Sequence, residues 1–158
     1  MMLEGLRMIL NNVSRYVRDT RLLLKDNSIE HATLLAMYAA EELGKASLLH
    51  QSSEKDQPSV DLQLFRGKQA HERKMDEARR LLGDSVLLQS SVFGRARFPF
   101  VLGAPDVEAT PELRMDCTFV DFREGKWKFG ALFAAEHLDR LLVDLETQTS
   151  LILARLDA

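Results

Sequence analysis

Two residues have types and a spacing that could support RNA cleavage: Arg66 and His71, in the stretch Arg-Gly-Lys-Gln-Ala-His. On a helical path, residues five apart lie within about two turns of each other. A neutral histidine can take a proton from a ribose 2′-hydroxyl, or as imidazolium can give one to a leaving oxygen. A guanidinium can hold the phosphate that gains charge during the attack. The pattern alone is more typical of an exposed basic helix, so the pairing is a hypothesis that needs further support.

A second group of candidate residues lies in the middle of a predicted helix: Glu41, Glu42 and Lys45. Glu41 and Lys45 are four apart in the order that favours a helical ion pair, and Glu42 and Lys45, three apart, could also meet. Charges are costly to bury unless they are paired. The three side chains either solvate a partly exposed end or form a buried or cleft-lining polar cluster. The second alternative would mark a site or an interface.

The segment from Arg66 to Arg80 is locally basic. It carries six basic and three acidic residues, a charge of +3 in a chain whose formal net charge is −3. His71 and Lys74 lie inside it. The acidic balance of the whole chain argues against an indiscriminate nucleic-acid binder, but it is compatible with a local basic site.

The motifs of common metal and cofactor chemistries are missing from the sequence. No Glu is followed three residues later by His, which argues against the paired Glu-x-x-His ligands of di-iron bundles. There is no HExxH, no cysteine cluster and no phosphate-binding glycine loop. Cys117 lies in an apolar stretch with no histidine nearby in the sequence, so it is a poor candidate nucleophile. We therefore expect neither a metal nor a cofactor.

Size and composition fit one globular domain over residues 1–158, with 46% hydrophobic and 28% charged residues. A single cysteine permits no intrachain disulfide and no signal peptide is visible, which together suggest the cytoplasm. The N-terminal apolar positions are interrupted by Glu4, Arg7, Asn11 and Asn12, so we expect no membrane-spanning segment.

Apolar periodicity predicts the helices that must position these candidate residues. We expect helices over residues 2–25, 28–52, 62–82 and 130–156. The helix over 28–52 is apolar on nearly every side, which is typical of a central, buried helix. One strip of that helix consists of small residues, where another helix could approach closely: Ala36, Ala40, Gly44 and Ser47.

The remaining segments predict less regular structure. Gly83 is expected to end the third helix, and residues 94–113 are expected to form a long loop interrupted by Gly and Pro. Strand-favouring residues on either side of Glu124 and Gly125 predict a short β-hairpin over residues 115–129. The expected fold is all-α, an antiparallel bundle of four or five helices with a small β-hairpin appendage.

Three stretches, HATLLAMYAAEELGKASLL, HERK and FVDFREGKW, resemble the abortive-infection family AbiV, which belongs to the HEPN superfamily of helical-bundle domains. The resemblance covers roughly residues 28–75 and 116–128, and Glu-Glu-Leu-Gly-Lys is its most specific part. It implies that Arg66 and His71 form a metal-independent endoribonuclease site of the Arg-x(4–6)-His type. The same resemblance gives supporting roles to Glu41, Glu42, Lys45 and Lys74. Gly67 departs from the pattern, because a polar residue often follows the motif arginine in active HEPN nucleases.

The resemblance implies an effector of phage defence, similar to a toxin, that works as a homodimer on RNA. A phage-derived activator or an antitoxin would be a further partner. The alternative is a non-catalytic HEPN module that binds a nucleotide or a protein partner. The position of His71 would distinguish the enzyme from the binding module. An Arg66–His71 pair in a solvent-reachable cleft across a two-fold axis favours the enzyme, whereas a His71 sealed against Glu41 or Glu42 favours a structural role.

Overall fold

Four helices make up most of the described part of the chain. The structure is a computed structural model. It describes residues 2–54, 70–83, 96–98, 107–109, 121–123, 126–128 and 135–157. The helices are α1 (Met2–Lys25), α2 (Ile29–Ser53), α3 (Ala70–Leu82) and α5 (Ala135–Leu156). They lie where the sequence predicted helices, and the first residues of the third and fourth predicted helices, 62–69 and 130–134, fall outside the described residues.

A tight turn sets α1 and α2 antiparallel. Asn27 has a φ of 56°, a left-handed conformation that Asn tolerates better than most residues. The backbone N–H of Ser28 donates to the carbonyl of Leu23 (2.8 Å), and that of Asn27 donates to Leu24 (3.1 Å). These two bonds form a Schellman motif, which satisfies the last carbonyls of α1 and turns the chain back on itself.

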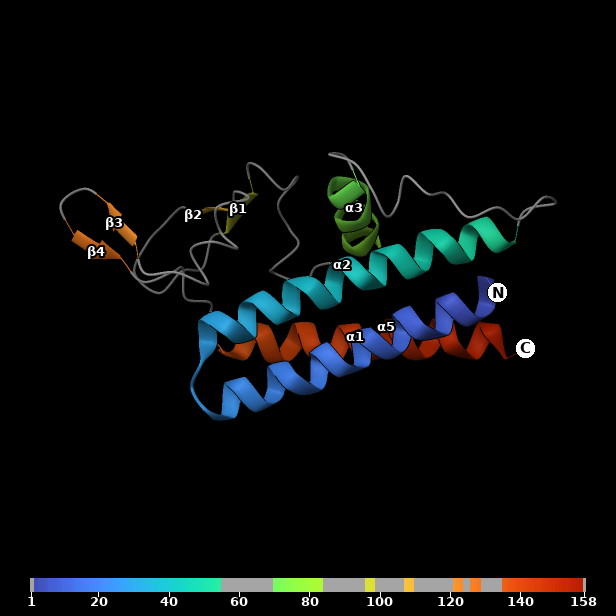
Figure 1. Cartoon of the computed structure of the whole chain (residues 1–158), viewed down its shortest axis with the longest axis horizontal. Helices are drawn as coiled ribbons and strands as arrows, with labels where there is room; N and C mark the ends of the chain where they lie inside the picture. The colour runs from blue at the N-terminus through green and yellow to red at the C-terminus, as the bar shows by residue number, and fades with distance from the viewer. Residues whose placement is uncertain are drawn as a thin grey trace.

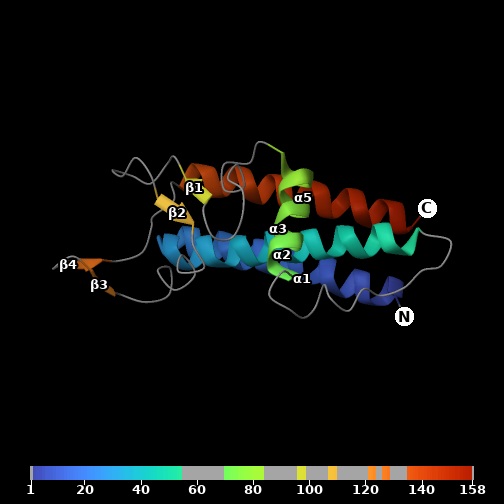
Figure 2. The same cartoon turned by 90° about the horizontal axis from the view of Figure 1, so that it is seen from above.

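The central helix is α2, which packs against α1, α3 and α5 (Figures 1 and 2). Just over half of its residues are buried, and they are spread around every side of the helix. A helix can be buried on all sides only if neighbours cover all of its faces, as the apolar pattern of this segment predicted. The expected all-α helical bundle is therefore confirmed, with α1 antiparallel to both α2 and α5 (Figure 1).

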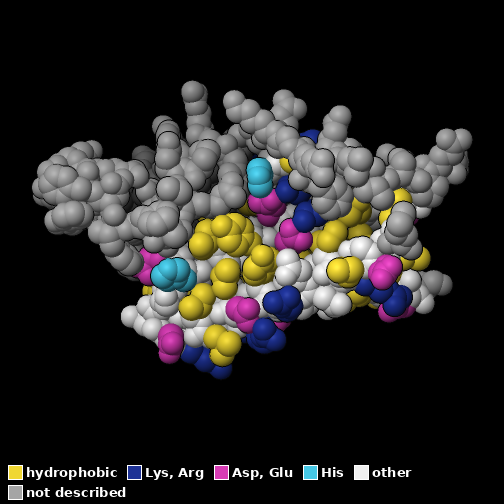
Figure 3. Space-filling view, in the orientation of Figure 1, with side chains coloured by type: hydrophobic (Ala, Val, Ile, Leu, Met, Phe, Trp, Pro, Cys, Tyr) yellow, Lys and Arg dark blue, Asp and Glu magenta, His cyan; other side chains and the backbone are white. Residues whose placement is uncertain are grey.

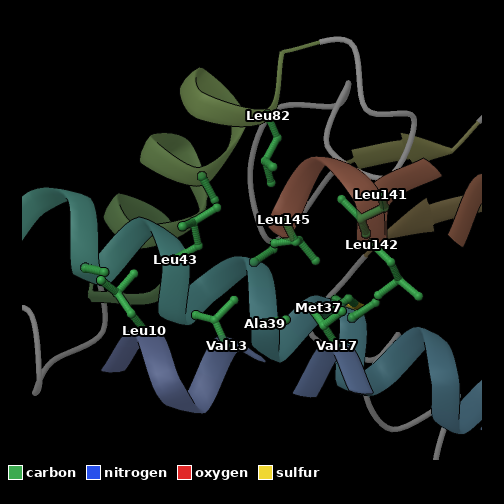
Figure 4. Packing of buried hydrophobic residues seen from close by; sticks show 14 of the residues in the cluster. Leu10, Val13, Val17, Met37, Ala39, Leu43, Leu82, Leu141, Leu142 and Leu145 are labelled. Atoms are coloured by element: carbon green, nitrogen blue, oxygen red, sulfur yellow. The ribbon is translucent and has the colours of Figure 1, made fainter. Parts of the chain in front are cut away.

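The hydrophobic core joins all four helices (Figure 4). Leucines of α5 lie against the faces of α1 and α2, and the end of α3 covers them from above. Burying a side chain of this size contributes about 1.5–3 kcal/mol. The buried side chains include Leu10, Val13 and Val17 of α1, Leu43 of α2, Leu82 of α3, and Leu141, Leu142 and Leu145 of α5.

Ion pairs connect α1 to α5 and to Asp157, the residue that follows α5, along the solvent-exposed edge of the core. Arg7 donates to Asp157 (2.7 Å), and Arg21 donates two hydrogen bonds to Glu146. Exposed pairs of this kind contribute little to stability, so the packing of the two helices depends on the apolar core.

None of the helices in the described ranges has both the length and the apolar character needed to cross a membrane.

The helix α3 crosses α2 steeply and comes closest to it at Gly44 (Figure 2). A Cβ atom added to Gly44 would overlap the carbonyl oxygen of Lys74 and would lie 2.8 Å from its carbonyl carbon. The backbones of the two helices are therefore in direct contact, and only a glycine fits at this position. The predicted strip of small residues is buried as a whole, and Gly44 is its point of closest approach.

Short strand pairs lie in the chain between α3 and α5. β1 (Ala96–Phe98) pairs antiparallel with β2 (Val107–Ala109), and β3 (Asp121–Arg123) pairs antiparallel with β4 (Lys126–Lys128). The second pair falls within the predicted hairpin, with Phe122 opposite Trp127. Residues 124–125, which would form its turn, lie outside the described residues, so the hairpin appendage stays a prediction. Gly83 ends α3 with a φ of 57°, as its type and position predicted.

Replacing Gly44 with Ala tests the contact between α2 and α3. The new methyl group would collide with backbone rather than with a flexible side chain, so the helices must separate. We expect the free energy of unfolding to fall by about 2–3 kcal/mol, measured by urea denaturation. Gly5→Ala is the matched control, because a Cβ there meets nothing within 4 Å and should stabilise α1 by about 0.5–1 kcal/mol. Equal effects of the two changes would contradict the contact.

Candidate functional site

Glu41 on α2 and two residues of α3, His71 and Lys74, form a polar cluster, called the Glu41 cluster below. The Nδ1 atom of His71 lies 2.8 Å from Glu41 Oε1, and the ammonium of Lys74 donates to the same oxygen (2.5 Å). Figure 3 shows acidic, basic and histidine side chains grouped on this face, over α2 and α3. The structure thus brings together three of the six residues that the sequence singled out.

The Glu41 cluster follows from the crossing of the two helices. Glu41 lies one turn before Gly44 on α2, and His71 lies one turn before Lys74 on α3. Because the backbone of Lys74 rests on Gly44, the side chains of Lys74 and His71 can both reach Glu41. The glycine in the Glu-Glu-Leu-Gly-Lys block therefore has a physical role, since it lets α3 approach closely enough for these contacts.

Burial distinguishes the three members of the Glu41 cluster. Glu41 is 8% exposed and Lys74 is 5% exposed. Both charged groups have lost most of their hydration, and the ion pair between them compensates for that loss. The side chain of His71 remains 45% exposed. An ionised carboxylate can only accept hydrogen bonds, so Nδ1 of His71 carries the proton and donates to Glu41. This bond restrains the orientation of the ring, and in the neutral imidazole it leaves Nε2 as the nitrogen without a proton.

Glu42 and Lys45 form a separate pair within α2. They are joined three residues apart, with 19% and 14% of their side chains exposed. Of the two local pairings that the sequence allowed, the structure has this one, whereas Glu41 reaches across to α3. One alternative placed these three charges at a partly exposed helix end. That alternative is wrong for Glu41, which is buried in the middle of the bundle.

Arg66 lies outside the described residues, as does Gly67. The pairing of Arg66 with His71 therefore stays a prediction.

Within the described ranges, no three His, Cys, Asp or Glu side chains are grouped closely enough to hold a metal ion.

Sequence reasoning missed a second buried carboxylate, Glu77 of α3. It accepts hydrogen bonds from Ser47 (2.5 Å), Gln51 (2.7 Å) and Arg80 (2.7 and 2.9 Å), and these four residues are called the Glu77 cluster below. Burial alone would raise the pKa of Glu77. The hydrogen bonds from Arg80 and Ser47, the charge of Arg80 and the bond from Gln51 outweigh burial and hold the pKa below its ordinary value.

Only part of the Glu77 cluster had a signal in the sequence. Glu77 and Arg80 are three apart on one helix, a spacing that favours a pair. The contact of Glu77 with Ser47 joins residues thirty apart in sequence, and no local pattern predicts it.

The family model of AbiV, a family of HEPN domains, matches residues 1–147. The chain belongs to the AbiV family. No curated protein and no solved structure matches it. The match extends from α1 through α2 and α3 into α5, so both clusters lie inside the AbiV domain, and the resemblance seen in the sequence is confirmed.

A double-mutant cycle tests the buried pair of the Glu41 cluster. In this AbiV domain, Lys74→Met leaves the carboxylate of Glu41 buried without its ammonium, which should lower the free energy of unfolding by about 3–5 kcal/mol. Glu41→Gln combined with Lys74→Met removes both charges, and we expect the double variant to recover most of that loss. Additive losses in urea denaturation would contradict a direct pair.

The lowered pKa of Glu77 predicts an acid-dependent stability. Since the folded pKa lies below the ordinary value of 4.5, the unfolded chain takes up the proton first as the pH falls. The stabilisation is therefore complete above pH 4.5 and is lost as the pH falls through the folded pKa. Glu77→Gln should be less stable than wild type at pH 7 and should lose less stability between pH 5 and pH 3, measured by urea denaturation. Glu4→Gln, at an exposed position, is the matched control; an unchanged acid slope in Glu77→Gln would contradict the assignment.

Proposed function

We propose that this AbiV domain is a metal-independent endoribonuclease of phage defence in which His71 is the general acid or base. The observation that carries the proposal is the state of His71. Its ring is held by Glu41 through Nδ1, yet nearly half of its side chain remains exposed. A general base needs both a fixed orientation and access to substrate, and the bond to Glu41 and the exposed part of the side chain support these two requirements.

The proposed chemistry needs only proton transfer and charge stabilisation. Nε2 of His71 takes the proton of a ribose 2′-hydroxyl, and the 2′-oxygen forms a bond to phosphorus. The bond from phosphorus to the 5′-oxygen breaks, and that oxygen takes up a proton from solvent water as it leaves, while the imidazolium returns its own proton to the solvent. The products are a 2′,3′-cyclic phosphate and a 5′-hydroxyl end. Glu41 stabilises the imidazolium that forms, as a carboxylate does beside a catalytic histidine.

The other candidate residues take separate roles in this proposal. Arg66 would hold the phosphate. Lys74 is too buried for contact with RNA, so we assign it to neutralising and holding Glu41. Glu42 and Lys45 would stiffen α2 beside the Glu41 cluster. The active unit would be a homodimer that acts on RNA, with a phage-derived activator or an antitoxin as regulator.

The rival function is a non-catalytic module that binds a nucleotide or a protein partner. Under that alternative the Glu41 cluster only joins α2 to α3, and His71 would be sealed against Glu41. The bond to Glu41 is compatible with both functions, but a 45% exposed side chain favours the catalytic one.

Cleavage of a mixed RNA pool in EDTA tests the proposal. We expect wild-type protein to cleave and His71→Ala to lose at least about 10²-fold in rate, because general acid–base catalysis typically contributes that much or more. His31→Ala is the matched control, since His31 is exposed near the start of α2 and contacts only Ser28 among the bonds described. Mass spectrometry should find cyclic phosphate ends.

Three results would contradict parts of the proposal. Full cleavage by His71→Ala with an unchanged circular dichroism spectrum would remove His71 from catalysis. Cleavage that EDTA abolishes would exclude the metal-free mechanism. RNA binding without cleavage by the wild-type protein would favour the binding module.

A further inference from the structure

One face of α2 carries an aromatic ring beside the Glu41 cluster. Tyr38, Glu41 and Lys45 follow one another at spacings of three and four residues, which places them on one face of the helix. Tyr38 and Lys45 are partly exposed, and Glu41 is the buried residue between them. Figure 3 shows hydrophobic side chains on this face, next to the grouped histidine and charged side chains. An aromatic ring therefore lies one helical turn from the carboxylate that holds His71.

The direction of side chains on a helix brings Tyr38 nearer to the proposed general base. Side chains of an α-helix lean toward its N-terminus, so each residue covers the turn before its own. The carboxylate of Glu41 therefore lies over the turn that contains Tyr38, and His71 is bonded to that carboxylate. A base and a 2′-hydroxyl are attached to the same ribose. A base that rests on Tyr38 would thus bring its own 2′-hydroxyl toward His71.

The environment of Tyr38 differs from that of a core residue. Tyr16 of α1 packs against the hydrophobic core, whereas Tyr38 belongs neither to that core nor to the partly buried residues packed against it. The two rings touch, with their centroids 6.0 Å apart and their planes at 48°, and this contact orients the Tyr38 ring. The hydroxyl of Tyr38 makes no hydrogen bond with a residue in the described ranges. A partly exposed ring that is held by one neighbour has surface left for a planar ligand.

The charges next to Tyr38 are balanced in pairs. Glu41 is paired with Lys74, and Glu42 is paired with Lys45. Two neutralised pairs offer little attraction to a phosphate, and their carboxylates offer little repulsion to a base. An aromatic ring stacks on any base, because every base has a π-face. This turn of α2 therefore suits a nucleobase better than a phosphate.

We propose that Tyr38 binds the RNA substrate by stacking on the base beside the cleaved bond, an inference that rests on the proposed nuclease. The base lies on the Tyr38 ring, and its ribose lies toward His71. Stacking is present before and during the reaction alike, so Tyr38 contributes affinity and takes no part in proton transfer.

Binding of an analogue that cannot be cleaved tests the stacking separately from the nuclease. The probe is a single-stranded oligonucleotide of 2′-fluoro RNA, which lacks the attacking hydroxyl, and the matched probe is an abasic oligonucleotide of the same length. The chain has two tyrosines, so in ¹H–¹³C NMR spectra Tyr16→Phe leaves Tyr38 as the one tyrosine ring signal. We expect the 2′-fluoro RNA to shift this signal upfield, because a stacked base shields the ring, and the abasic probe to leave it in place.

Tyr38→Leu is the main variant, and Tyr16→Leu is the matched control, because either change removes the same contact between the two rings. We expect Tyr38→Leu to weaken binding of the 2′-fluoro RNA about tenfold, since base–aromatic stacking is lost, and Tyr16→Leu to weaken it much less. Tyr38→Phe keeps the ring and should bind as the wild type does. With cleavable RNA, Tyr38→Leu should raise KM and leave kcat unchanged.

Three results would overturn the role of Tyr38. These are no binding of 2′-fluoro RNA by the wild-type chain, a Tyr38 signal that stays in place when the RNA is bound, and equal weakening by Tyr38→Leu and Tyr16→Leu. A Tyr38 signal that shifts in a protein that cleaves no RNA would support the stacking and contradict the nuclease alone.

Discussion

The backbone contact between α2 and α3 at Gly44 is the constraint on which both polar clusters depend. Glu41 lies three residues before Gly44 and Ser47 lies three residues after it, so the two residues flank the contact by one turn each. On α3, Lys74 and Glu77 are also one turn apart. Each pairs with the residue of α2 that faces it, Lys74 with Glu41 and Glu77 with Ser47. One close approach of two helices therefore places two buried carboxylates.

The two carboxylates position α3 more than they stabilise the fold. Removing charges from water is costly, and a buried ion pair often gains no more than apolar residues of the same size would. Its breakage is nevertheless expensive, so α3 cannot slide along α2 by one turn without leaving Glu41 or Glu77 unpaired. The apolar core, in contrast, would tolerate small shifts, because leucine contacts are not directional. The position of His71 relative to Glu41 therefore depends on the polar contacts.

The sequence was sufficient to predict the helices and the central place of α2, because apolar periodicity and all-round apolarity are local properties. It also predicted the strip on which α3 rests, since small residues mark close approach. The sequence did not predict which residues pair with Glu41. The local rule offers Lys45, four residues away, whereas the structure uses Lys74, which is 33 residues away. Contacts between two helices depend on where the helices cross, and the spacing of residues along one helix does not predict that crossing point.

The histidines His71 and His50 lie in different environments. His71 has a carboxylate on Nδ1 and a partly exposed side chain, so its tautomer is set while the side chain stays near the surface. His50 is buried, and its two ring nitrogens make no hydrogen bond with any described residue and are closed to solvent. A fixed and partly exposed ring suits proton transfer, whereas an enclosed ring does not. A displacement of α3 along α2 would separate His71 from Glu41, so the backbone contact at Gly44 also sets the position of the ring that the proposed chemistry uses.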